Sequence, residues 1–131
     1  MGLKEKQWKR SIEEQYVAEF KQDVKAILGA EPEVSVDWDS FASADEIMYI
    51  PTYALDRVKS AFRVLAEDQD AKEEIVAQIK TLQLNNLSDN AEENKAMRIA
   101  DGVFTLEVGF GGNHACVFND LAIREFLENN L

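Results

Sequence analysis

Apolar residues recur at three- and four-residue steps along the first quarter of the chain, which is the spacing of one face of an α-helix. The pattern runs over residues 4–28 without proline or glycine, and its apolar members are Trp8, Ile12, Tyr16, Val17, Phe20, Val24, Ile27 and Leu28. Gly29 follows directly, and glycine commonly ends a helix. The pattern therefore predicts a long amphipathic N-terminal helix that stops at Gly29.

A strict alternation of apolar and polar residues follows over residues 33–39. Val34, Val36 and Trp38 fall on one side of such a segment, because successive side chains of a strand point to opposite faces. The other side carries Glu33, Ser35, Asp37 and Asp39. This segment is predicted to be a half-buried strand with an acidic outer face.

Helical spacing returns in the middle of the chain. Pro51 and Thr52 suit the start of a helix, and the apolar residues that follow predict a helix over residues 52–67. Asp70 and Glu73 resemble a capping box, so a shorter helix is expected from there to about Ile79.

The last third of the chain reads mainly as short strands, because apolar and polar residues alternate over residues 82–84, 97–99 and 104–110. Asp101 and Gly102 form a strong two-residue hairpin signal. Gly111, Gly112 and Asn113 predict a second turn before a last strand over residues 115–118. Asn119 or Asp120 is then expected to cap a C-terminal amphipathic helix.

Grouped helices and grouped strands, without regular alternation of strand and helix, predict an α+β fold. We expect one domain over residues 1–131, with an antiparallel sheet of about four to five short strands. Helices are expected to pack on one face of this sheet, among them the long N-terminal helix and the C-terminal helix. The other face is expected to meet solvent or a partner.

The balance of charged residues narrows the classes of partner. The chain carries a formal charge of −11, with +1 on residues 1–30 and −12 on residues 31–131. This excess of negative charge opposes binding to nucleic acid phosphates and to anionic membranes. A basic protein is the partner that the charge favours.

The cysteine content indicates the compartment and limits the metal chemistry. Cys116 is the only cysteine, so the chain can form neither an internal disulfide nor a zinc site built from several thiolates. The first residues do not have the pattern of a secretory signal, and we therefore expect a cytoplasmic protein. The sequence predicts no cofactor and no metal ion.

Two pairs of residues have types that can carry chemistry. Asp37 and Asp39 share a strand face, where paired carboxylates can bind a divalent cation or perform acid–base catalysis. His114 and Cys116 are also two residues apart, and an imidazole can help to form a thiolate. Each pair lacks the further ligands or loops that a complete site needs, so we assign no catalytic residue.

The leading hypothesis is a non-enzymatic protein-binding module, similar in kind to an inhibitor or an immunity protein. It would bind a basic partner through an acidic sheet face that contains Glu33, Asp37, Asp39 and Glu107. The alternative is a small enzyme or ligand-binding protein with a site near Asp37 and Asp39 or near His114 and Cys116. A homodimer formed through the N-terminal helix is a further hypothesis.

Overall fold

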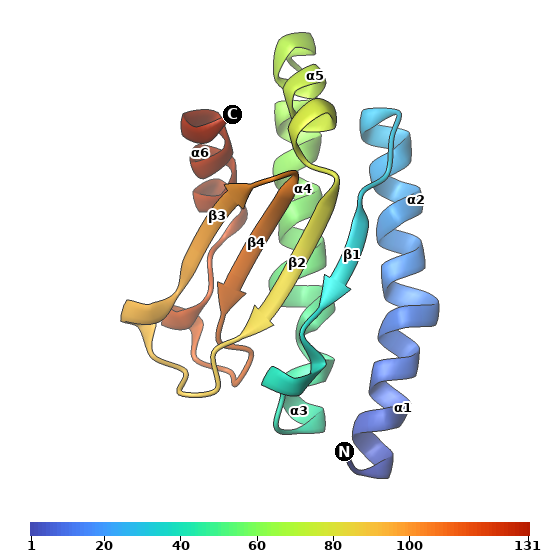
Figure 1. Cartoon of the computed structure of the whole chain (residues 1–131), viewed down its shortest axis with the longest axis vertical. Coiled ribbons are helices and arrows are strands. Elements are labelled where there is room, and N and C mark those ends of the chain that lie inside the picture. The colour runs from blue at the N-terminus through green and yellow to red at the C-terminus, as the bar shows by residue number, and fades with distance from the viewer.

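The N-terminal helix forms where its apolar spacing predicts it. The computed structural model describes all residues from 1 to 131. In Figure 1 the helix runs without a break through α1 (Leu3–Ser11), a π-helical turn (Ile12–Tyr16) and α2 (Val17–Leu28). Gly29 ends it with a φ of 79°, a left-handed conformation that glycine adopts without steric cost. Ile12, Phe20, Val24 and Leu28 are buried.

The first strand is shorter than the alternating pattern predicts. β1 covers Glu33–Val36, and a 3₁₀ turn (Trp38–Ser40) follows it. The hydroxyl of Ser40 donates a hydrogen bond of 2.6 Å to the carbonyl oxygen of Asp37, and the backbone N–H of Ser40 donates to the same oxygen. These bonds curl the chain, so Asp39 does not continue the row of strand side chains.

The middle of the chain is helical, with bounds that differ slightly from the prediction. A short helix that the sequence pattern did not indicate, α3 (Ala44–Met48), is capped by Ser43 and Glu46. A π-helical turn (Pro51–Leu55) leads into α4 (Asp56–Leu65), and α5 covers Gln69–Gln78. The side chain of Asp68, not that of Asp70, caps α5 by accepting hydrogen bonds from two backbone N–H groups.

The α+β class is confirmed, but the sheet is mixed, so the prediction of an antiparallel sheet is wrong. Its strands are β1, β2 (Thr81–Asn86), β3 (Ala96–Ala100) and β4 (Val103–Val108), in the order β1-β2-β4-β3. β2 is parallel to both β1 and β4, and only β3 is antiparallel to its neighbour. The helical crossover through α3, α4 and α5 returns β2 in the direction of β1.

The hairpin predicted at Asp101 and Gly102 is confirmed. It joins β3 to β4, and both turn residues have positive φ, 54° and 80°. The strand predicted over residues 115–118 is wrong, because His114–Cys116 form a 3₁₀ turn. β4 already has a neighbour on each side, and the side chain of Asn113 accepts from the N–H of Ala115 to start the turn. The C-terminal helix α6 covers Asp120–Asn130, and Asn119 caps it.

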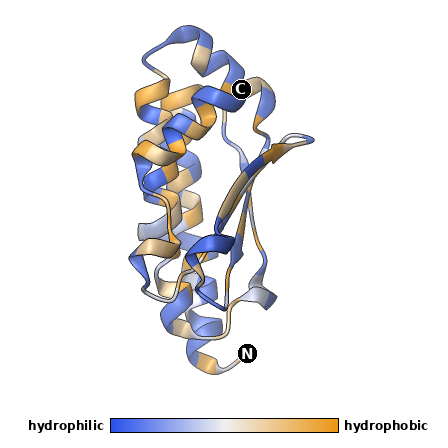
Figure 2. Cartoon of the chain, turned by 90° about the vertical axis from the view of Figure 1, so that its left-hand side faces the viewer, coloured by the Kyte–Doolittle hydropathy of each residue, from blue (hydrophilic) through white to orange (hydrophobic).

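The helices form one layer and the sheet forms the other. Seen from the side in Figure 2, the helices lie against one face of the sheet and leave the other face uncovered. The strands send Leu82, Leu84, Phe104, Leu106 and Val108 toward the helices, where all five are fully buried. They belong to one continuous core of 25 buried residues. The alternate side chains of each strand consequently point to the uncovered face.

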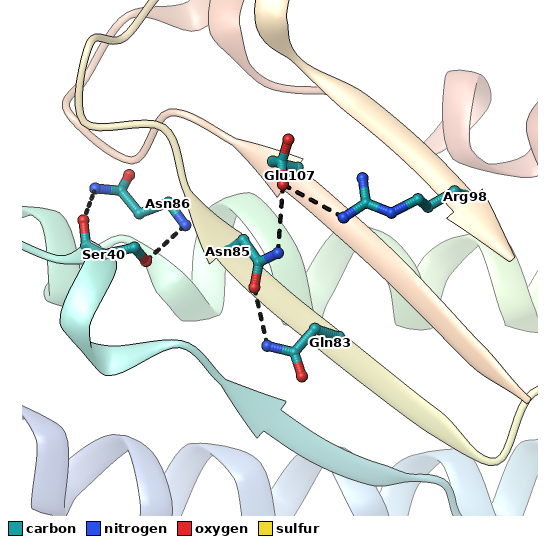
Figure 3. A network of polar contacts seen from close by, with 6 residues as sticks. All are labelled: Ser40, Gln83, Asn85, Asn86, Arg98 and Glu107. Carbon is teal, nitrogen blue, oxygen red and sulfur yellow. Dashed lines mark hydrogen bonds and ion pairs between the residues drawn. The ribbon is translucent and has the colours of Figure 1, made fainter. Parts of the chain in front are cut away.

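The buried side chain of Asn86 ties the ends of the parallel strands together. Its Nδ2 donates to the carbonyl oxygen of Ser40 at 2.9 Å and to Oε2 of Glu46 at 3.0 Å. Its Oδ1 accepts from the N–H of Phe110 at 2.9 Å, and its own backbone N–H donates to Oγ of Ser40. The two contacts with Ser40 are drawn in Figure 3. One residue of β2 thus holds the segments that follow β1 and β4.

We expect Asn86→Ala to lower the free energy of unfolding by about 2–3 kcal/mol, because it leaves a buried backbone N–H and two acceptors without partners. Urea unfolding measures the change. Asn85→Ala is the matched control, since Asn85 is next in the strand but points to the uncovered face, and its expected cost is below about 1 kcal/mol. Equal losses in the two variants would contradict this role of Asn86.

Candidate functional site

The sheet face that no helix covers is the candidate site. We call it the uncovered sheet face, and the strand registers place eleven residues on it: Glu33, Ser35, Thr81, Gln83, Asn85, Ala96, Arg98, Ala100, Val103, Thr105 and Glu107. Most of these side chains are small or polar. The face can therefore meet water or a polar protein surface without exposing a large apolar area.

A chain of polar contacts crosses the uncovered sheet face from β2 to β3 (Figure 3). Nε2 of Gln83 donates to Oδ1 of Asn85 at 2.9 Å, and Nδ2 of Asn85 donates to Oε2 of Glu107 at 3.3 Å. Arg98 then pairs with the same carboxylate oxygen of Glu107 at 3.5 Å. Each side chain restrains the next, so the centre of the face presents polar groups in fixed positions.

The structure brings three of the four predicted acidic residues to this face or to its end. Glu33 lies on β1, and Glu107 lies two strands away on β4. Asp37 continues the register of β1, because its N–H donates to the carbonyl oxygen of Leu84, and this places it in one row with Asn85 and Glu107. At the usual strand spacing, the Cα atoms of Asp37 and Glu107 are about 10 Å apart. Asp39 lies outside this row, in the 3₁₀ turn.

The charges on the face are less one-sided than the sequence pattern implied. Glu33 pairs with Lys21 on α2 at 3.2 Å, although 75 % of its side chain stays exposed. Glu107 is 27 % exposed and pairs with Arg98. Asp37 and Asp39 are exposed and belong to none of the chain's ion pairs. The unpaired negative charge is therefore concentrated at the end of β1.

His114 and Cys116 lie in different environments. His114 is exposed, and its ring meets the ring of Tyr53 edge-on with centroids 5.8 Å apart. Cys116 is fully buried, and this burial raises the pKa of its thiol. The negative charge of Asp89 also raises that pKa, while a hydrogen bond from the backbone of Gly109 acts in the opposite direction. The thiol is therefore held in its protonated, unreactive form near neutral pH.

The spacing of residues in the sequence does not predict the close packing around Gly109. A Cβ atom built there would lie 2.2 Å from Oδ1 of Asn90 and 2.7 Å from Sγ of Cys116, so only glycine fits. Oδ1 of Asn90 is buried without a hydrogen-bond partner, and the backbone of Asn90 has a φ of 53°. The only sequence signal for this packing is that Asn90 lies in a predicted loop, where Asn can adopt a positive φ more easily than most residues.

Comparison with known proteins finds no match to a family model, to a curated protein or to a solved structure. No three His, Cys, Asp or Glu side chains are grouped so that they could hold a metal ion. None of the helices combines the length and the apolar character that crossing a membrane requires.

Burial of Cys116 predicts two measurable effects. Alkylation of the native protein is expected to be slow at pH 7–8 and to become fast only in denaturant. Stability is also expected to fall as the pH rises above about 8.5, because the unfolded thiol ionises there while the folded thiol, with its raised pKa, does not.

Cys116→Ala is the control for the second effect, since its stability should fall less steeply over the same pH range. Urea unfolding between pH 7 and 10 compares the two chains. Rapid alkylation of the folded protein at neutral pH, or identical pH profiles for the two chains, would contradict the description of Cys116 as a buried thiol.

Proposed function

We propose that this chain is a non-enzymatic protein-binding module, similar in kind to an inhibitor or an immunity protein. Its uncovered sheet face and the adjacent end of β1 bind a basic protein. Glu33, Asp37, Asp39 and Glu107 are the acidic residues of this binding surface. A cytoplasmic setting belongs to the same proposal, in keeping with a chain whose one cysteine is a buried free thiol.

The observation that carries the proposal is that three parallel strands have one face uncovered. Parallel strands are usually covered on both faces, because their connections place helices there. In this chain the connection from β2 to β4 passes through β3 instead of a helix. The uncovered face is thus available to a partner over the whole width of the sheet.

The shape and order of the face also suit a partner. Ser35, Ala96 and Ala100 are small and lie on the two edge strands, so a protein surface can approach the sheet closely. The contacts of Gln83, Asn85, Glu107 and Arg98 fix the polar groups before binding, which lowers the entropy lost in the complex.

Charge supports a basic partner. Asp37 and Asp39 form no ion pair within the chain, although Asp39 shares a surface hollow with Lys6, Lys9 and Arg10. Most of the side chain of Glu33 is in solvent. A basic surface that approaches the end of β1 gains attraction from these carboxylates without breaking an internal ion pair of either aspartate. Such attraction mainly raises the association rate and selects among partners.

The double variant Asp37→Lys/Asp39→Lys tests this assignment. We expect it to keep its fold and to bind the partner at least about tenfold more weakly at low salt, which corresponds to about 1.4 kcal/mol. The partner is first captured from source-cell lysate at low salt, identified by native mass spectrometry, and then titrated against each variant. Its affinity for the unsubstituted chain should fall as salt is added.

Glu73→Lys/Glu125→Lys is the matched control. Both glutamates are exposed on helices α5 and α6, and the net charge changes by the same amount. Unchanged affinity of the Asp37→Lys/Asp39→Lys chain at low salt would remove the proposed surface. An equal loss of affinity in the control would show that only the overall charge of the chain matters, and it would also contradict the proposal.

A further inference from the structure

A groove that is distant from the uncovered sheet face lies between the end of α4, α5 and α6. It encloses about 230 Å³, and its floor is apolar: Leu65, Ala71, Ile75, Leu127 and Leu131. Asp70, Glu74 and Glu128 form its acidic rim. An adjoining, more open hollow shares Leu65, Ala71 and Glu128 with the groove and adds Val64, whose side chain is 40 % exposed, together with Glu67 and Asp68. We call the whole feature the acidic groove.

The negative charge of the acidic groove is hardly compensated. Arg124 is the only basic residue that lines it, and it pairs with Glu128 at 3.7 Å. The other four acidic side chains of the groove have no ion pair within the chain. An apolar floor inside an acidic rim is complementary to an amphipathic helix that carries both apolar and basic side chains.

The chain itself carries an element of this kind at the opposite end of the molecule. None of the residues of α1 is buried, and Leu3 is 74 % exposed. Residues 1–11 contain four basic side chains and one acidic one. Lys9 lies over the ring of Trp38, 5.4 Å from its centroid, which leaves Lys4, Lys6 and Arg10 exposed. In Figure 1 the start of α1 is at the bottom, while α5 and the end of α6 are at the top.

We propose that the acidic groove of one copy of this chain accepts the exposed start of α1 from a second copy. Leu3 enters the apolar floor. Lys6 and Arg10 lie on the same side of the helix as Leu3, because residues three and four apart are neighbours on a helix surface. These two cations then face Glu74 and Glu128 on the rim.

The position of the two surfaces determines how the copies associate. Because they lie at opposite ends of the molecule, a single contact joins two different surfaces head to tail, and it leaves the α1 start of one copy and the acidic groove of the other copy free. Each added copy leaves one free α1 start and one free acidic groove. The contact is small, so we expect association that depends on concentration and weakens in salt. This inference is independent of the proposed function of the uncovered sheet face.

Two variants separate the halves of the contact. The head variant Leu3→Ser/Lys6→Gln/Arg10→Gln removes the apolar side chain and the charge from α1. The groove variant Glu74→Lys/Glu128→Lys gives the rim positive charge, which repels α1. All five residues are exposed, so both variants should fold, and circular dichroism checks this. Glu73→Lys/Glu125→Lys is the control, with the same charge change on the same two helices outside the groove.

Sedimentation velocity at low salt measures the average mass at protein concentrations from about 10 μM to about 1 mM. A contact with a dissociation constant of about 1 mM, which is a binding free energy of about 4 kcal/mol, is therefore still detected. We expect the average mass to rise above the monomer mass of 14.8 kDa for the unsubstituted chain and for the control. For each variant alone, the average mass should remain at 14.8 kDa. An equimolar mixture of the two variants should reach twice this mass and no more. In that mixture only the α1 of the groove variant and the groove of the head variant can meet.

Four results would overturn the proposal. The first is an unsubstituted chain that stays monomeric up to about 1 mM. The second is association that the head variant abolishes and the groove variant retains, which would indicate a symmetric dimer through α1. The third is association that neither variant weakens. Binding of another protein's basic helix to the groove, with the free chain monomeric, would likewise assign the groove to a different partner.

Discussion

The three hydrogen bonds of the Asn86 side chain hold together the place where β1, β2 and β4 end. The rest of the sheet depends on them, because the connection from β2 to β4 contains only β3 and a short 3₁₀ turn, and no α-helix that could cover the strand ends. Glu46 takes part from α3, where its other carboxylate oxygen accepts from the backbone N–H groups of Ala42 and Ser43. A buried amide with two donors and an acceptor suits this place, since a carboxylate at position 86 would face that of Glu46.

The uncovered sheet face takes its order from the same strands, although it lies on the side away from Asn86. Asn85 and Asn86 are adjacent in β2, and alternation sends one side chain outward and the other inward. The inward amide fixes the strand ends, and the outward amide connects Gln83 to Glu107. The uncovered sheet face is polar and ordered at its centre, whereas the acidic groove is apolar at its floor and charged at its rim.

The hydrophobic pattern was sufficient for the helices other than α3, for the strands near residues 82–84, 97–99 and 104–108, and for the hairpin at Asp101 and Gly102. Strand direction was not predictable in this way, because the alternation of Leu82 and Leu84 is the same in a parallel and an antiparallel sheet. The pairing of Arg98 with Glu107 depends on register between strands, which sequence spacing does not encode. Asparagine is a residue type that is common in turns, so the burial of Asn86 could be recognised only from the tertiary structure. The acidic groove is lined by residues from three helices. The sequence of each helix alone shows acidic residues on its exposed side, but not that the three helices form a groove together.

The turn at Asp101 and Gly102 also bears on the order in which the sheet is built. β3 and β4 meet across two residues, whereas β1 reaches β2 only after residues 37–80 have been placed, and β2 reaches β4 only after residues 87–102. Closing a long loop costs more entropy than closing a short one, and local pairs form sooner. We therefore expect the C-terminal hairpin to nucleate the sheet. During synthesis, the helices of the first half leave the ribosome before that nucleus exists. Their apolar faces therefore stay exposed until the last third of the chain has been made and the sheet can cover them.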